Sequence, residues 1–136
     1  MDKFKRELEF LPKPYKGVLD RYWSWMPAEM QWVCKDKIIT LLEGHTRLWR
    51  AKNLERYLDE KYHDFKARVY LKLEGDNLGT HSFKDRGMTA AVTMARVHGK
   101  RVAICASTGN TAAAASAYCK EAGIKPIVGL EAYVAP

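Results

Sequence analysis

The sequence predicts an α/β fold, in which βαβ units with a parallel sheet follow an irregular, partly helical N-terminal arm. Two observations lead to this prediction. From residue 69 onwards, short strand-like apolar runs alternate with longer helical stretches, and only a few residues connect them. Glycines also stand where the helical stretches are expected to stop. Strands that alternate with helices are typical of parallel sheets with right-handed crossovers.

Five elements are expected in this part of the chain: strands over 69–73, 101–105 and 126–130, and helices over 82–98 and 112–122. The strand-like runs contain valine, isoleucine and tyrosine, whereas the second helical stretch is rich in alanine. Ser82 is a candidate N-cap, and Asp85 is placed as the acidic member of a capping box. Gly99 and Gly123 are expected to end the two helices.

Residues 1–50 differ from the rest of the chain in composition and in apolar periodicity, and they are predicted to form the N-terminal arm. They contain all four tryptophans and three of the five prolines, and their apolar periodicity is weak. Residues such as Leu8, Leu11 and Leu19 could form short helical pieces that prolines interrupt. We expect the tryptophans to fill a core or an interface rather than to stack on nucleic-acid bases.

Composition and charge exclude several classes of protein. The chain has 136 residues, of which 47% are apolar and 29% charged, so a disordered, collagen-like or low-complexity chain is excluded. The 23 Lys and Arg exceed the 16 Asp and Glu by seven, but the two signs are interleaved. Such a pattern is typical of a solvated surface and suits anionic substrates. No nucleic-acid partner is expected, because no motif interleaves the tryptophans with clustered cations.

No targeting, membrane or metal signal is visible. No apolar run approaches the roughly 20 residues that cross a bilayer, and the charged N-terminus lacks the apolar region of a signal peptide. We therefore expect a cytoplasmic protein with no membrane partner. Cys34, Cys105 and Cys119 are far apart and form no CxxC, so neither a disulfide framework nor a metal site is predicted.

The predicted sheet places two loops where ligands bind. In parallel sheets, ligands bind beyond the carboxyl ends of the strands, and loops 74–83 and 106–111 both belong to that edge. The first loop leads to Lys84 in the first turn of a helix, where the positive dipole end disfavours a cation and favours a neutral, nucleophilic amine. The alternative is a surface lysine paired with Asp85 or another acid, and the residues alone leave both open.

The second loop, S-T-G-N-T at 107–111, is rich in hydroxyl groups and leads into a helix. Its backbone N–H groups and hydroxyls could hold a carboxylate or a phosphate, and Gly109 would let a ligand approach closely. The alternative is a helix start capped by Ser107, Thr108 or Asn110. The chain contains neither a P-loop motif nor GxGxxG, so a nucleotide site of those kinds is not supported.

Both loops contain motifs that resemble a known family. The segments S-F-K-D-R-G-M (82–88) and C-A-S-T-G-N-T (105–111) are similar to those of threonine synthases, which belong to the fold type II pyridoxal-phosphate enzymes, the tryptophan-synthase-β-like group. The upstream segment L-E-G-H-T-R-L (42–48) and Y-K-G-V-L (15–19) are also similar to segments of that family. The resemblance therefore covers most of the chain.

The resemblance implies a role for each matching residue. Lys84 would form the Schiff base with pyridoxal phosphate and then move protons on the substrate, Phe83 would shape the cofactor pocket, Asn110 would bond the cofactor 3-oxygen, and Ser107, Thr108 and Thr111 would hold the substrate α-carboxylate. The implied reaction converts O-phosphohomoserine and water to threonine and phosphate. Alternatives are another β/γ-elimination or replacement enzyme of the family, such as a threonine dehydratase, or a truncated non-catalytic or binding protein.

The chain also departs from the family pattern. His81 stands where the family has glycine, in a loop that is one residue longer and lacks a proline; it could be an acid/base group, an anion contact or a loop-packing side chain. His45 and Arg47 replace an asparagine and a proline. Arg86 could contact a phosphate or form a structural ion pair.

Length is a further departure, because members of the family are several hundred residues long and hold the cofactor phosphate with a downstream glycine-rich loop. We therefore expect an N-terminal portion, with residues 51–136 as the start of an α/β cofactor-binding domain that is incomplete at its C-terminus. Such a portion is expected to be inactive alone, and its parent could be a homodimer.

Overall fold

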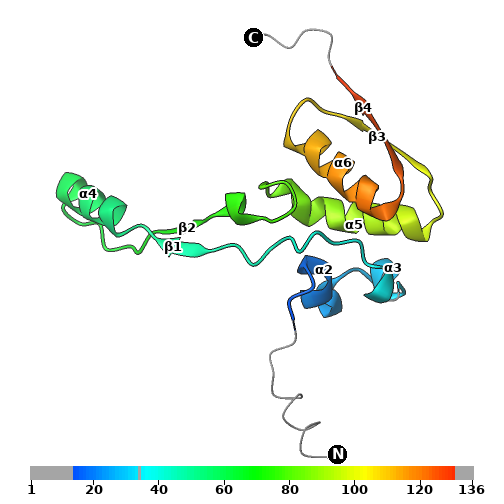
Figure 1. Cartoon of the computed structure of the whole chain (residues 1–136). Helices are drawn as coiled ribbons and strands as arrows, with labels where there is room; N and C mark the ends of the chain where they lie inside the picture. Colours follow the sequence, from blue (N-terminus) through cyan, green and yellow to red (C-terminus); the bar gives the residue numbers. More distant parts are fainter. Residues whose placement is uncertain (1–13, 34, 131–136) are drawn as a thin grey trace, which may run out of the picture.

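The computed structural model describes residues 14–33 and 35–130, and it confirms a mixed helix and strand architecture (Figure 1). In chain order the elements are α2 (Val18–Arg21), η1 (Trp23–Trp25), α3 (Ala28–Gln31), η2 (Lys35–Lys37), β1 (Leu48–Arg50), α4 (Lys52–Tyr62), β2 (Tyr70–Lys72), η3 (Glu74–Asp76), α5 (Lys84–Val97), β3 (Val102–Ala106), α6 (Asn110–Ala122) and β4 (Lys125–Gly129). They form a helix–sheet body, from which β1, α4 and β2 project as a long hairpin-like arm, here called the projecting hairpin (Figure 1).

The body is built around the parallel pair β3 and β4. Their register runs from Val102 opposite Lys125 to Ala106 opposite Gly129, and α6 connects them, so that β3–α6–β4 is a βαβ unit as predicted. The small alanine side chains of α6 allow it to pack closely against α5 and both strands. Side chains of this layer and the segment before β1 form the core: Ile39, Val92, Tyr118, Cys119, Ala122 and Ile124. The other face of the pair is open, and Ile104 is 79% exposed.

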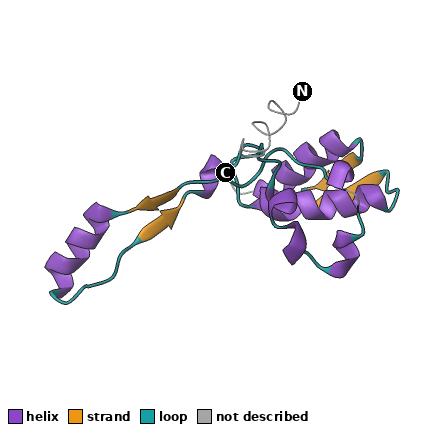
Figure 2. Ribbon diagram, turned by 90° about the horizontal axis from the view of Figure 1, so that it is seen from below, coloured by secondary structure: helices purple, strands orange, loops and turns teal. Residues whose placement is uncertain are grey.

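The predicted strand over 69–73 forms, but it does not join the parallel sheet. As β2 it pairs antiparallel with β1, with Leu48 opposite Lys72 and Arg50 opposite Tyr70. The expectation that this strand opens the parallel βαβ series is therefore wrong. The physical reason is that the backbone groups of a strand need a partner, and residues 47–51 supply it at the other end of α4. Figure 2 shows these two strands far from the parallel pair.

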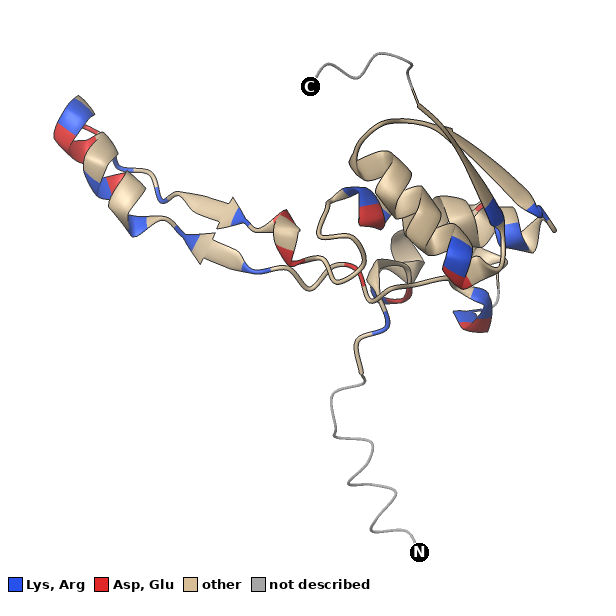
Figure 3. Ribbon diagram, turned by 45° about the horizontal axis from the view of Figure 1, so that its top comes forward, with Lys and Arg blue, Asp and Glu red and all other residues tan. Residues whose placement is uncertain are grey.

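The projecting hairpin has little burial of its own. None of the 11 residues of α4 is buried, and lysine, arginine, aspartate and glutamate are interleaved along it (Figure 3). β1 ends at Arg50 and pairs with β2, so this pairing joins the predicted N-terminal arm (1–50) to the predicted cofactor-binding domain (51–136). The boundary between these two parts stays a prediction.

The two long helices begin at slightly different residues than predicted. α5 starts at Lys84 rather than at 82, and the prediction of Ser82 as its N-cap is wrong, because Phe83 occupies that position and has no side-chain cap bond. The Ser82 hydroxyl lies one residue further out and accepts the Lys84 N–H at 3.2 Å. Asp85 closes no capping box; it accepts the N–H and the hydroxyl of Thr80 at 2.7 and 2.5 Å. α6 starts at Asn110 rather than at 112, and it ends as predicted at Gly123, which has a left-handed φ of 68°.

The N-terminal tryptophans do not fill the core. Trp25 is 83% and Trp32 is 88% exposed, so the expectation of core filling is wrong for them, and the interface alternative remains. Helical pieces of three or four residues present too little surface to bury such large rings. Leu8, Leu11 and Cys34 lie outside the described residues, whereas Cys119 is buried and Cys105 half-buried.

In the part of the chain that the structure describes, no helix is both long enough and apolar enough to pass through a membrane.

Candidate functional site

The starts of α5 and α6 lie at one end of the helix–sheet body. Only residues 98–101 join α5 to β3, and only residues 107–109 join β3 to α6. The chain therefore reverses direction twice, and both helices run antiparallel to β3. Their N-termini therefore face the carboxyl end of β3 (Figure 1). The structure thus brings Lys84 and loop 107–111 to the same edge, as the sequence predicts.

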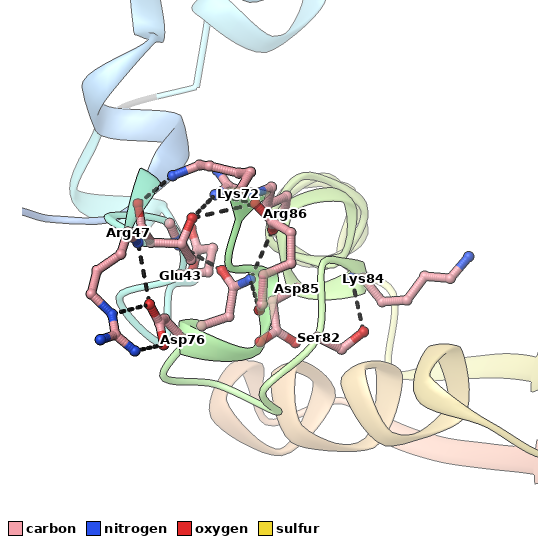
Figure 4. A network of polar contacts seen from close by, with 12 residues as sticks. Glu43, Arg47, Lys72, Asp76, Ser82, Lys84, Asp85 and Arg86 are labelled. Carbon is pink, nitrogen blue, oxygen red and sulfur yellow. Dashed lines mark hydrogen bonds and ion pairs between the residues drawn. The ribbon is translucent and has the colours of Figure 1, made fainter. Parts of the chain in front are cut away.

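Lys84 is half-buried at the first position of α5. Its Nζ lies 4.9 Å from the centre of the Phe83 ring, and the ring is itself largely exposed. The alternative of a pair with Asp85 is wrong, because no ion pair joins these two residues; the buried Asp85 carboxylate instead accepts the N–H and the hydroxyl of Thr80. Figure 4 shows the Lys84 side chain pointing away from the polar network beside it. The four ion pairs among the described residues do not include Lys84.

Loop 107–111 forms an open turn before α6. The Ser107 hydroxyl accepts the Gly109 N–H at 3.2 Å, and Gly109 rather than a hydroxyl residue occupies the N-cap position. A Cβ added at Gly109 would meet no atom within 4 Å, so the backbone there faces open space. Thr108 and Asn110 are exposed, while Ser107 and Thr111 are half-buried. The Gly109 carbonyl accepts the N–H groups of Ala112 and Ala113. The N–H groups of Asn110 and Thr111 precede them at the helix start, where a ligand can act as the acceptor.

A buried carboxylate, Glu43, supports this end of the body. Its side chain is fully buried and accepts four hydrogen bonds of 2.8–3.1 Å, from Val18 N, Leu41 N, the Thr40 hydroxyl and the Tyr118 hydroxyl. Burial and then the Glu43 charge raise the pKa of Tyr118 above its ordinary value, so this phenol stays a donor. Glu43 therefore ties the N-terminal segment to α6.

A second set of bonds ties loop 74–79 to α5. Arg86 is bidentate with Glu74 through bonds of 2.8 and 3.0 Å, which lowers the pKa of Glu74, and it also reaches the Thr46 hydroxyl at 3.0 Å (Figure 4). Asn77 is fully buried, accepts the Gly44 N–H and donates to Glu74. Of the two predicted alternatives for Arg86, the structural ion pair is confirmed.

The residues that depart from the family pattern sit in special backbone positions. His45 and His81 have φ values of 53° and 57°, in the left-handed region where glycine is easiest to accommodate. The Nδ1 of His81 lies 3.1 Å from the Gly75 carbonyl, which favours the loop-packing alternative. Arg47 pairs with Asp76, and this guanidinium lowers the pKa of that carboxyl to about 2.

Sequence reasoning missed Glu43, Glu74 and Asn77 as supporting residues. Glu43 stands in the segment 42–48 that resembles the family, which was a usable signal. Glu74 and Asn77 flank the lysine loop without a recognisable motif, and their partners Thr46 and Gly44 lie 28 and 33 residues away in sequence.

Gly79 is expected to be intolerant of a side chain. A Cβ there would lie 2.8 Å from Oδ2 of Asp85 and 3.2 Å from the Tyr118 hydroxyl, both of them buried. Gly79→Ala should lower the free energy of unfolding by about 1–3 kcal/mol, as overpacking does. Urea unfolding measures this, with Gly75→Ala as the control because a Cβ there meets no atom within 4 Å. Equal midpoints for the two variants would contradict the prediction.

Comparison with known proteins gives consistent matches. The sequence model of the family described as "Pyridoxal-phosphate dependent enzyme" matches residues 39–136. Proteins named threonine synthase are similar to this chain: that of Mycobacterium tuberculosis is 46% identical over 112 residues, that of Methanocaldococcus jannaschii 45% over 126, and that of Synechocystis 39% over 122. These alignments cover 82%, 93% and 89% of this chain. The chain spans only 28–29% of the length of these relatives.

Proposed function

The chain belongs to the family of pyridoxal-phosphate dependent enzymes, and from that premise we propose that it forms part of a threonine synthase-like lyase. The proposed reaction takes O-phosphohomoserine and water to threonine and phosphate. Relatives that are 39–46% identical and carry the name threonine synthase support it. The observation on which it rests most is the placement of Lys84 and loop 107–111 at one edge, with the lysine outside the ion pairs of the described residues.

The donor groups at this edge fit pyridoxal phosphate. Lys84 offers a primary amine to the cofactor aldehyde, and the exposed Phe83 ring offers an apolar surface beside it. Asn110 offers an amide at the start of α6 for the cofactor 3-oxygen. When bound, the cofactor would supply an electron sink for carbanions at the substrate.

The chain's own residues would bind and orient the substrate. The hydroxyls of Ser107, Thr108 and Thr111, together with the first N–H groups of α6, form a donor set for an α-carboxylate. The open space beside Gly109 allows the carboxylate to approach the backbone. The Lys84 amine would then hold and move protons at the substrate carbons, as a general base placed at a helix start.

The remaining sequence predictions belong to the same proposal. They are a fold type II parallel sheet in the whole protein, an N-terminal arm over 1–50 followed by a cofactor-binding domain from 51, a cytoplasmic location and a homodimeric parent. A small amino-acid substrate is the expected partner.

The proposal is tested by product analysis on a full-length protein that contains this chain. With O-phosphohomoserine and pyridoxal phosphate, we expect threonine and phosphate in equal amounts, and no turnover by the 136-residue chain alone. A protein that instead deaminates threonine to 2-oxobutyrate would favour the threonine dehydratase alternative. Threonine formation by the isolated chain would contradict the expectation that it is inactive alone.

A further inference from the structure

A buried carboxylate holds the helix turn that contains Lys84. Asp85 is fully buried, and its carboxylate accepts the backbone N–H of Thr80 at 2.7 Å and the Thr80 hydroxyl at 2.5 Å. These two bonds, here called the Asp85 clamp, run from the start of α5 back to the loop before it. Lys84 therefore lies inside the segment 80–85 that the clamp closes. None of the steps proposed for the site uses Asp85.

The Asp85 clamp leaves little freedom to the groups that form it. A Cβ added at Gly79 would lie only 2.8 Å from Oδ2 of Asp85, so the loop backbone already lies against the carboxylate. A buried carboxylate is costly without hydrogen bonds, so Asp85 has to keep its bonds to Thr80. Because one donor is a backbone group and the other a side-chain group of the same residue, the two bonds fix the orientation of the loop as well as its distance from α5.

Directional bonds also fix the rotation of α5 about its own axis. Asp85, Thr89 and Thr93 are all fully buried and follow one another at intervals of four residues, so they lie on one face of the helix. The Thr89 hydroxyl donates to the Ile39 carbonyl at 2.6 Å, and the Thr93 hydroxyl accepts the Ile39 N–H at 2.9 Å. Apolar contacts are non-directional, whereas these bonds permit only a narrow range of angles. Of the three residues, Asp85 alone lies in the first turn, so the orientation of that turn depends on it.

The orientation of the first turn sets the direction in which Lys84 points. Neighbouring residues on a helix point about 100° apart, so an inward Asp85 turns Lys84 out of the buried face. Figure 4 shows Asp85 on the side of the polar network and the Lys84 side chain directed the other way. Lys84 takes part in no ion pair among the described residues, so the backbone beneath it is what aims the amine.

We propose that Asp85 is a positioning residue for the Lys84 amine: together with Thr80 it holds the first turn of α5 so that the amine points to the edge where loop 107–111 lies. This role rests on the proposed function, because it assumes that Lys84 bonds the cofactor. Misplacement of a reacting group by about 1 Å lowers a rate by about 10²-fold, but it leaves the amine available for bonding. Loss of the clamp should therefore impair orientation and turnover while the cofactor stays attached.

Asp85→Asn in a full-length protein that contains this chain tests the proposal. With pyridoxal phosphate, we expect this variant to keep the visible absorbance of the lysine-bonded cofactor. The circular dichroism of the same band reports how firmly the protein orients the cofactor, and it should lose most of its intensity. The kcat should fall by about 10²-fold with little change in KM, as expected when only the geometry of the reacting groups is impaired.

Further variants separate positioning from loss of folding. Thr80→Val keeps the backbone N–H bond and removes only the hydroxyl bond, so it should fold and lower kcat about tenfold. Thr80→Ser keeps both donors and should restore kcat and the circular dichroism band. Asp76→Asn is the matched control, because it makes the same change in the same loop at a carboxylate bonded to Arg47, and it should alter neither readout. Equal losses in Asp76→Asn and Asp85→Asn would overturn the proposal.

The 136-residue chain provides a readout that needs no cofactor. Hydrogen exchange of the Thr80 N–H should be slower in the unmodified chain than in Asp85→Asn, because the clamp protects this group. Equal exchange rates in the two folded chains would show that the clamp does not form in solution and would overturn the proposal.

The outcomes for Asp85 can be told apart from those for the proposed function. A folded Asp85→Asn protein with an unchanged circular dichroism band and unchanged kcat contradicts the positioning role alone, since the unmodified protein still forms threonine. Loss of the absorbance itself in folded Asp85→Asn also contradicts it, because the Lys84 amine is expected to stay available. A full-length protein that bonds the cofactor through Lys84 but forms no threonine contradicts the proposed reaction, and its circular dichroism band still decides the role of Asp85.

Discussion

Lys84→Ala in the full-length protein is expected to abolish the visible absorbance that pyridoxal phosphate acquires when a lysine amine bonds to it. Turnover should fall by at least about 10²–10⁴-fold, because the proposed base is lost together with the covalent anchor. Lys84 is the first residue of α5 and stands outside the ion pairs of the described residues, so no neighbouring carboxylate holds its amine. Absorbance spectroscopy with added cofactor measures the first effect, and product formation the second.

Two further variants sharpen this experiment. Lys84→Arg keeps the positive charge but offers no nucleophilic amine, so it should lose the absorbance as completely as Lys84→Ala. Lys100→Ala removes an exposed lysine elsewhere and should change neither readout. Borohydride reduction followed by peptide mass analysis should place the cofactor on the peptide that contains Lys84. A cofactor adduct on any other lysine, or unchanged absorbance in Lys84→Ala, would contradict the assignment.

Glu43→Ala is expected to cause the largest loss of stability. The change leaves four donors without an acceptor and removes a fully buried side chain. The Tyr118 hydroxyl is fully buried and the other three donors are half-buried, and a buried unsatisfied donor costs about 1–3 kcal/mol. Together with the cavity left by the side chain, the total loss should reach at least about 3 kcal/mol. Since a domain is stable by only about 5–15 kcal/mol, this variant should be partly or wholly unfolded at room temperature.

Milder changes keep the Glu43 prediction measurable. Glu43→Gln retains one acceptor oxygen and turns the other into a donor that faces donors, so it should cost about 1–3 kcal/mol in urea unfolding. Tyr118→Phe removes one of the four bonds and should cost about 1 kcal/mol. Glu29→Gln, at an exposed position, should stay within about 0.5 kcal/mol of the unmodified chain. If Glu43→Gln unfolds at the same urea concentration as Glu29→Gln, the network does not contribute to stability.

Two predicted strands both form but pair with different kinds of partner, which shows what local sequence patterns can and cannot decide. Residues 101–105 and 69–73 have similar apolar texture, and both form strands, β3 and β2. β3 lies in the parallel pair because α6 packs back onto it, whereas β2 pairs with β1, which belongs to the predicted N-terminal arm. Strand formation depends on local side chains, but the choice of partner depends on which backbone edge lies nearby in space.

The candidate site shows the same division. Lys84, Asn110 and the hydroxyls of loop 107–111 were identifiable because each lies in a short contiguous motif at a helix start. The hydrogen-bond partners that hold this site together were not identifiable, since Glu43 bonds Tyr118 across 75 positions and Asn77 bonds Gly44 across 33. A single sequence contains no signal for a hydrogen bond between residues that distant.

The sequence by itself determined the helices α5 and α6, the strands β3 and β4, the lysine and hydroxyl motifs at their ends, and the similarity to pyridoxal-phosphate enzymes. Secondary-structure propensity, apolar periodicity and helix-stop residues act over a few neighbouring positions, so short stretches of sequence are enough to predict these features. Only the tertiary structure decided that β2 pairs with β1 and not with the parallel strands, and that Arg86 forms an ion pair with Glu74. It also decided that Arg21, Lys72 and Arg86 line one pocket. Each of those depends on burial and on contacts between segments far apart in sequence, which form only when the chain packs.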